Sequence, residues 1–186
     1  MILPIVAFGS PILRKNCVDI TPEYPQLETL LANMWATMYE ASGVGIAAPQ
    51  VNKAIRLFLI DTTPFIEDEE ESEVVIVKQT FINARIIEEK GEEWDFNEGC
   101  LSIPDIREVV SRKSTITIEY FDENFKKHTD TYDGLAARVI QHEYDHVDGI
   151  LFTDKISALR KRMIKGKLID ISKGKVNAAY KMRFAR

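Results

Sequence analysis

The sequence predicts an α+β fold in which antiparallel or mixed sheets pack around a central helix that carries the motif His-Glu-x-x-His. Three observations lead to this prediction: an amphipathic helix is expected early in the chain, strand-like segments occupy its middle, and a second amphipathic helix follows them. A chain of 186 residues can bury roughly 70% of its unfolded surface. We therefore expect a single domain over residues 1–186.

The first helix is expected over residues 25–40. Its large apolar side chains recur at steps of three and one, which places them on one face of an α-helix. These side chains are Leu27, Leu30, Leu31, Met34, Trp35 and Met38. These side chains are expected to belong to the hydrophobic core. Residues 42–45 (SGVG) are expected to end the helix.

The middle of the chain is expected to form strands and one hairpin. Single strands are expected over residues 55–61, 74–77 and 81–87. Residues 115–121 and 127–132 alternate between apolar and polar, and the turn-forming residues 122–124 (DEN) between them predict a hairpin. The acidic run at 67–73 (EDEEESE) is expected to be a surface loop.

The second amphipathic helix is expected to begin after Asp133 and to end near Gly149. The carboxylate of Asp133 can accept backbone N–H bonds in the first turn, and glycine commonly ends a helix. Residues at steps of four, three and four share one face of this helix: Leu135, Val139, His142 and His146. The two histidines therefore extend an apolar stripe and point inward. A further helix is expected over residues 156–170.

The composition favours a cytoplasmic protein. Two cysteines, Cys17 and Cys100, are too few for a disulfide framework, which favours a reducing compartment. No apolar run approaches the ~18 residues that a membrane span needs, so no membrane partner is expected. The N-terminal residues have neither a basic segment nor a small-residue cleavage site after an apolar stretch.

Charge is distributed unevenly along the chain, whose formal net charge is −5. The tail from Lys155 onward holds eleven Lys or Arg residues and one acidic residue, whereas residues 1–154 hold thirteen basic and 28 acidic residues. One interpretation is a solvated tail that balances an acidic body. The other is contact with an anionic surface such as RNA. Nothing in the tail indicates sequence-specific readout of nucleic-acid bases.

Residues 142–146 (HEYDH) have the spacing of a metal site. Two residues four apart on an α-helix differ by about 40° in direction and by ~6 Å in height, so the imidazoles of His142 and His146 can bind one ion. Glu143 lies beside them and can reach a water molecule at the ion. The alternative is a chance pair of histidines. However, inward-pointing imidazoles without partners are costly to bury, which favours an ion.

A third ligand is not evident downstream of this motif. Zinc proteases with His-Glu-x-x-His take theirs from a downstream Glu or His. After His146 the chain has neither, and its remaining acidic residues are Asp148, Asp154 and Asp170. Asp148 is too close along the same helix to complete the site easily. The other histidine, His128, lies on the predicted hairpin.

Cys100 can supply the missing ligand. Gly99 and Pro104 bracket an extended segment that can present its thiolate. One Cys and two His leave the fourth tetrahedral position open, which is typical of a catalytic zinc-type site. The alternative is that Cys100 is a small buried hydrophobe, as is expected for Cys17.

Three segments together resemble the motifs of the peptide deformylase family, in the family's order. They are residues 43–50 (GVGIAAPQ), 98–102 (EGCLS) and 141–146 (QHEYDH). Alone, the first segment is a glycine turn with an amide donor, Gln50, and is more often structural. The resemblance spans about residues 1–155. The acidic run looks like an insertion, and the basic tail has no clear counterpart, so contact between the tail and the ribosome stays an open expectation.

The resemblance implies an activity and a cofactor. Peptide deformylases remove the formyl group from the N-terminal formyl-methionine of nascent chains and release formate. The ligands would be Cys100, His142 and His146. The ion would be a divalent metal, most often Fe(II) in the cell, and Zn(II), Ni(II) or Co(II) can occupy the same site.

The resemblance also implies roles for individual residues. Glu143 would take a proton from water and return it to the departing amine, while the Gln50 amide and the Leu101 N–H would stabilise charge on the formyl oxygen. The residues expected to bind substrate are Gly43, Val44, Gly45, Gly99, Arg107 and Val139.

Several of these residues have other interpretations. Val139, Ile46 and Ile140 either line the methionine pocket or are plain core. Glu98 and Arg112 either form an ion pair that orients the cysteine segment or are solvated charges, and the same alternative holds for Arg107 at the substrate entrance.

Two other functions are consistent with the motifs. The first is a His-Glu-x-x-His metallopeptidase, which the missing downstream ligand disfavours. The second is a non-catalytic metal-binding or RNA-associated protein, which only the basic tail supports.

Overall fold

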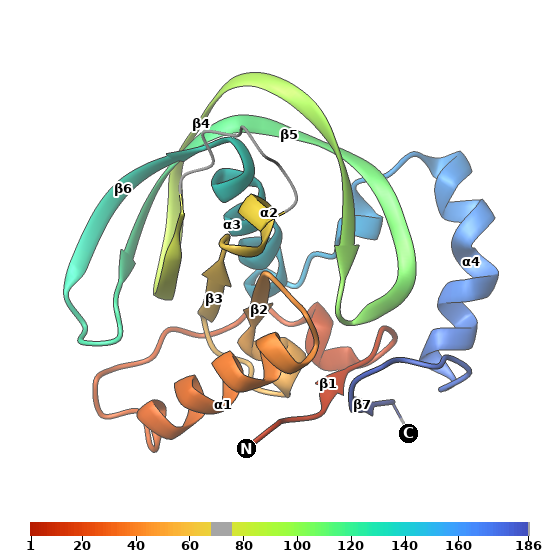
Figure 1. Cartoon of the computed structure of the whole chain (residues 1–186), viewed down its shortest axis with the longest axis horizontal. Helices are drawn as coiled ribbons and strands as arrows, with labels where there is room; N and C mark the ends of the chain where they lie inside the picture. Colours follow the sequence, from red (N-terminus) through yellow and green to blue (C-terminus); the bar gives the residue numbers. More distant parts are fainter. Residues whose placement is uncertain (68–75, 186) are drawn as a thin grey trace.

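The computed structural model describes residues 1–67 and 76–185 of the chain (Figure 1). Its strands are β1 (Ile5–Val6), β2 (Gly45–Ala47), β3 (Leu57–Asp61), β4 (Lys78–Cys100), β5 (Ile103–Phe121), β6 (Lys127–Asp133) and β7 (Met182–Arg183). Its α-helices are α1 (Leu27–Glu40), α2 (Pro64–Glu67), α3 (Gly134–Val147) and α4 (Ala158–Ser172). No helix among the described residues is long and apolar enough to cross a membrane.

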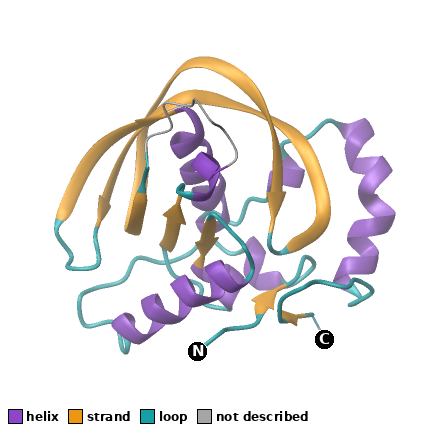
Figure 2. Ribbon diagram, viewed as in Figure 1, coloured by secondary structure: helices purple, strands orange, loops and turns teal. Residues whose placement is uncertain are grey.

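The predicted α+β fold is confirmed. Five strands form one antiparallel sheet in the order β2-β3-β4-β5-β6, and β1 pairs with β7 in a small parallel sheet. Figure 2 shows the large sheet curving around α3, with α1 below β2 and β3 in this view and α4 outside the arch at the right. The central helix therefore carries the motif His-Glu-x-x-His inside the curve of the sheet.

The long hairpin of β4 and β5 gives the sheet its curvature. β4 has 23 residues and β5 has 19, and their pairing is interrupted by four register shifts. Such bulges bend a strand and increase its twist, which allows the hairpin to arch over α3 (Figure 1). The expected strands 81–87 and 115–121 were too short for different reasons. In β4, residues 88–93 are exposed and show no apolar alternation. In β5, the inward-facing positions 108 and 112 are occupied by the buried charged residues Glu108 and Arg112, which hide the alternation.

Two other expectations need correction. The strand expected over 74–77 is wrong for residues 76 and 77, which precede β4, and residues 74 and 75 lie outside the described part of the chain. Of the acidic run 67–73, residues 68–73 also lie outside it. The Asp133 side chain makes no capping bond, because Asp133 is the last residue of β6 and its backbone pairs with Thr115.

Both amphipathic helices bury the predicted faces. In α1, Met34 and Met38 are fully buried against β2 and β3. Burying such a side chain stabilises the fold by roughly 1.5–3 kcal/mol. Helix α3 is buried on most of its surface, and Gly149 follows it with φ of +74°. Helix ends in this left-handed conformation favour glycine.

The C-terminal part of the chain returns to the N-terminus. The helix expected over 156–170 is α4, and the following residues run back to β7, which pairs with β1. The backbone N–H groups of Ile5 and Ala7 donate to the carbonyls of Lys181 and Arg183, both at 2.8 Å. Figure 1 shows the two chain ends close to this small sheet.

Candidate metal centre and cleft

Three candidate ligands meet between the end of β4 and the inner face of α3. The ligand atoms of Cys100, His142 and His146 all lie within 4.8 Å of one another. Cys100 Sγ is 3.3 Å from His146 Nε2, and the two imidazole rings have their centres 5.2 Å apart. His128 is elsewhere, because its ring nitrogen pairs with Asp122 at 2.8 Å beside the β5–β6 turn.

The chemistry of these donors fits a single metal ion. One sulfur and two imidazole nitrogens suit Fe(II), Zn(II), Ni(II) and Co(II). Burial lowers the pKa of His146 well below its usual value. Burial also opposes the charged form of His142, but its bonds with Cys100 and Glu98 raise its pKa well above the usual value. Both imidazoles must be neutral when they bind a metal. The Nδ1 atom of His142 pairs with Glu98 at 2.9 Å, which leaves Nε2 of His142 for the ion. A carboxylate behind a ligating histidine is the usual arrangement at metal sites.

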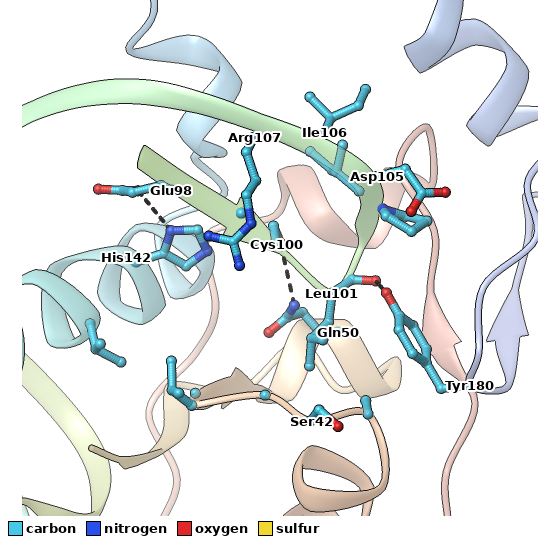
Figure 3. Close-up of a pocket in the computed structure, with 18 of the residues that line it drawn as sticks. Ser42, Gln50, Glu98, Cys100, Leu101, Asp105, Ile106, Arg107, His142 and Tyr180 are labelled. Atoms are coloured by element: carbon cyan, nitrogen blue, oxygen red, sulfur yellow. Dashed lines mark hydrogen bonds and ion pairs between the residues drawn. The ribbon is translucent and has the colours of Figure 1, made fainter. Parts of the chain in front are cut away.

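Glu98, whose bond to His142 is drawn in Figure 3, is the centre of a buried ion-pair network behind the candidate ligands. It accepts hydrogen bonds from Arg112 Nε and Nη2 at 2.7 and 3.0 Å and from Arg138 Nη1 at 3.0 Å. Arg112 also donates to Asp145 at 2.7 Å. Burial alone would raise the pKa of Glu98, but its bonds with His142 and Arg112 hold that pKa well below its usual range. The expected Glu98–Arg112 ion pair is therefore present and fully buried.

The sequence reasoning missed Arg138. This side chain is 2% exposed, and its guanidinium lies 4.4 Å from the ring centre of Trp94. It also donates to the carbonyls of Val110 and Trp94 at 3.0 and 2.6 Å. A signal was available, because Arg138 lies four residues before His142 and hence on the buried face of the same helix.

Glu143 lies deep in the cleft and faces Gly45. Its side chain is buried, and its Oε2 atom has no hydrogen-bond partner among the described residues. A Cβ at position 45 would lie 2.5 Å from Glu143 Oε1, so only glycine there leaves room for the carboxylate. Burial raises the pKa of Glu143 to about 7. A carboxyl in this range can both accept and donate a proton near neutral pH.

The orientation of the Gln50 amide is fixed by its neighbours. Gln50 is 1% exposed and lies in the short 3₁₀ helix Ala48–Val51. Its Oε1 accepts a bond from the Ala47 N–H at 2.8 Å, so its Nε2 faces the Cys100 segment. This nitrogen is 3.6 Å from Cys100 Sγ and 3.3 Å from Ser102 Oγ. An amide donor therefore points toward the three ligands.

Leu101 lies in the tight turn between β4 and β5. Its side chain packs against Gly43, where a Cβ would lie 2.8 Å from Leu101 Cδ1. Figure 3 shows Leu101 and Gln50 on the same side of Cys100.

A cleft of about 720 Å³ opens beside these groups. All six expected substrate-binding residues line it: Gly43, Val44, Gly45, Gly99, Arg107 and Val139. Arg107 is exposed, and its side chain passes over Gly99, where a Cβ would lie 3.3 Å from Arg107 Cγ. Ile46 and Ile140 are fully buried core instead. The sequence reasoning did not foresee residues 177–180, which come from the tail and also line the cleft.

Comparisons with known proteins agree with this geometry. A family model described as polypeptide deformylase matches residues 2–162. The chain is 62% identical over 189 residues to a peptide deformylase of Christiangramia forsetii, an alignment that covers 99% of this chain and 96% of that protein. It is 60% identical over 190 residues to a peptide deformylase of Flavobacterium johnsoniae, covering 100% and 97% of the two chains.

Solved structures resemble the fold as well. A peptide deformylase from Legionella pneumophila superposes with a TM-score of 0.80 at 34% identity, covering 94% of this chain and 98% of that one. A class I type b peptide deformylase from Acinetobacter baumannii, solved with Met-Ala-Ser bound, gives a TM-score of 0.75 at 33% identity, covering 84% and 99%.

Proposed function

This chain belongs to the polypeptide deformylase family and removes the N-terminal formyl group from nascent polypeptides, and we propose that it does so with Glu143, Gln50 and Leu101 as catalytic residues. The observation that carries this proposal is the convergence of three separate segments. The Cys100 thiol, the two histidines of α3 and the Gln50 amide all face one point in the cleft.

We propose that Cys100, His142 and His146 hold the single metal ion of the family. When bound, the ion supplies Lewis acidity toward the formyl oxygen and lowers the pKa of water. Fe(II) is the proposed ion in the cell, and Zn(II), Ni(II) or Co(II) are proposed substitutes, because sulfur and imidazole donors accept all four. Metal analysis of protein purified without oxygen tests this proposal.

Glu143 is proposed to carry the proton. As water adds to the formyl carbon, an oxygen of this carboxylate accepts the proton that the water loses. The same carboxyl then gives the proton to the methionine nitrogen as the C–N bond breaks, which releases formate and a free amine. The buried position of Glu143 supports this role, as does its Oε2 atom, which has no hydrogen-bond partner in the described part of the chain.

Gln50 and Leu101 are proposed to stabilise the formyl oxygen. Negative charge develops on this oxygen when water adds, and fixed hydrogen-bond donors aimed at it lower the barrier. Gln50 Nε2 is held toward the cleft by the bond between its Oε1 and the Ala47 N–H. The Leu101 N–H follows Cys100 directly in the chain, so it lies beside the proposed ligand.

The peptide part of the substrate is proposed to bind in an extended form. Strand β2 is at one edge of the large sheet, and an extended peptide can pair with such an edge. Val44 and Gly45 supply backbone groups there, and Gly99 does so from the end of β4 on the opposite side of the cleft. Val139 is proposed to contact the methionine side chain, and Arg107 is proposed to meet the following residues at the entrance.

The basic tail is proposed to contact the ribosome, within a chain that acts in the cytoplasm as one catalytic domain. Exposed basic side chains on α4 support this proposal: Lys161, Arg162, Lys165 and Lys167. Cosedimentation with ribosomes should weaken as salt rises. Charge-reversal variants on α4 should bind less while they deformylate a free peptide at the wild-type rate.

A formate-release assay tests the residue assignments. Gln50→Ala should lower turnover of formyl-Met-Ala-Ser by ~10²–10³, as expected when one oxyanion donor is lost. Gln79→Ala is a matched control, because Gln79 lies on β4 far along the chain from Cys100 and donates to the carbonyl of Thr80. Wild-type turnover by Gln50→Ala would refute the role of this amide. Cleavage of internal peptide bonds without formate would favour a metallopeptidase instead.

A further inference from the structure

The tail segment of residues 177–180 forms part of the cleft wall, although the family model matches only residues 2–162. Two attachments fix this segment. Downstream, β7 pairs with β1, so residues 182 and 183 are held by the N-terminal strand. Upstream, Val176 packs against the apolar cluster that also contacts Cys100. The segment between these points therefore has a defined position at the cleft.

One side chain of this segment reaches the proposed oxyanion site. The Tyr180 hydroxyl donates a hydrogen bond of 2.7 Å to the backbone carbonyl of Leu101 (Figure 3). Its ring is half-buried and packs against the cluster that contains Met38 and Ile46. Burial raises the pKa of Tyr180 above its usual value, so the hydroxyl keeps the proton that it donates.

The turn that contains Leu101 is held at three points. Tyr180 binds the Leu101 carbonyl, the Phe8 N–H donates to the Ser102 carbonyl at 2.8 Å, and Gln50 Nε2 donates to Ser102 Oγ at 3.3 Å. The first bond fixes the peptide plane between Leu101 and Ser102. Because that plane is attached to the Leu101 Cα, it limits the directions in which the preceding N–H can point.

We propose that Tyr180 is a positioning residue for deformylation: its hydroxyl orients the Cys100–Ser102 turn so that the Leu101 N–H faces the formyl oxygen. The inference rests on the role of Leu101 proposed above. It assigns a part in turnover to the segment of residues 177–180.

Tyr180→Phe removes the hydroxyl and keeps the ring. The Leu101 N–H is then less well aligned, and a loss of about 1 kcal/mol from its bond to the formyl oxygen in the transition state lowers kcat about fivefold. KM for formyl-Met-Ala-Ser should change less than twofold, because the peptide-binding groups stay in place. Metal content per chain should equal that of wild type. Tyr120→Phe is a matched control, since it removes a hydroxyl bond of 2.8 Å to Asp130 on the outer hairpin; it should change the melting temperature and leave kcat unchanged.

A second measurement observes the Leu101 N–H directly. In zinc-loaded Glu143→Gln protein, which cannot turn over substrate, formyl-Met-Ala-Ser should shift the Leu101 amide proton downfield. Adding Tyr180→Phe should reduce that shift. If the shift is absent even with Tyr180 present, the role of Leu101 fails. If the shift and kcat are both unchanged by Tyr180→Phe while the melting temperature falls, the hydroxyl only anchors the tail and the positioning proposal is wrong.

Discussion

The buried guanidinium of Arg138 offers a quantitative test of how the proposed metal ligands are supported. Its side chain is 2% exposed and donates to Glu98, to the Val110 carbonyl and to the Trp94 carbonyl. Arg138→Met keeps much of the volume and removes every one of these donors. Breaking one partner of a buried ion pair costs about 3–5 kcal/mol, and two backbone carbonyls lose a donor as well. We therefore expect the free energy of unfolding to fall by about 3–5 kcal/mol.

Urea unfolding of wild type and Arg138→Met at equal free Zn²⁺ measures this change in the free energy of unfolding. The comparison requires that both proteins show the same slope of free energy against urea concentration. A matched control is Arg85→Met. Arg85 makes two bonds to Asp19 at 2.8 and 3.0 Å, but its side chain is 47% exposed. Exposed pairs contribute about 0–1 kcal/mol. If Arg138→Met lowers the free energy of unfolding no more than Arg85→Met does, the buried ion pairs around Glu98 do not stabilise the site.

Three further results are expected. Gly45→Ala places a methyl group 2.5 Å from Glu143 Oε1, so it should lower kcat by at least tenfold without changing metal content; wild-type kcat would show that Glu143 can move freely. Cys100→Ser should lower the metal content or change the bound ion, as measured by metal analysis, and an unchanged content of the same ion would refute the ligand set. Hydrogen bonds from Thr63 and Tyr39 outweigh burial and lower the pKa of Asp61. The stabilisation from Asp61 is therefore present above about pH 4 and lost as the pH falls through the lowered value, and Asp61→Asn should reduce the pH dependence of urea unfolding between pH 5 and 3.

The features that were predicted best from the sequence are those that lie on a single helix. His142, Glu143 and His146 are within a single helical turn, so their mutual geometry follows from helix dimensions alone. Cys100 was found by a chemical argument, because the helix offered two ligands and a metal site needs more. The predicted helices α1 and α3 also have the expected boundaries to within a few residues.

The parts that were missed depend on contacts between distant segments. Arg138 meets Glu98 across 40 residues, and Tyr180 meets Leu101 across 79 residues. The helical spacing places Arg138 on the buried face of α3, but nothing in the sequence shows which partner Arg138 or Tyr180 meets. The length of β4 was missed for a related reason, since residues 88–93 are held by pairing with the neighbouring strand and not by burial of an apolar face. The length of β5 was missed because charged residues, Glu108 and Arg112, fill two of its buried positions.

The most direct test of the account is formate release by Glu143→Ala, measured together with its metal content. The geometry places Glu143 in the cleft beside the ligands, and the proposed ligand set does not include it. The account predicts near-total loss of formate release from formyl-Met-Ala-Ser, with one metal ion per chain as in wild type. Formate release at the wild-type rate would contradict the proposed role of Glu143, and loss of the ion would contradict the proposed ligand set.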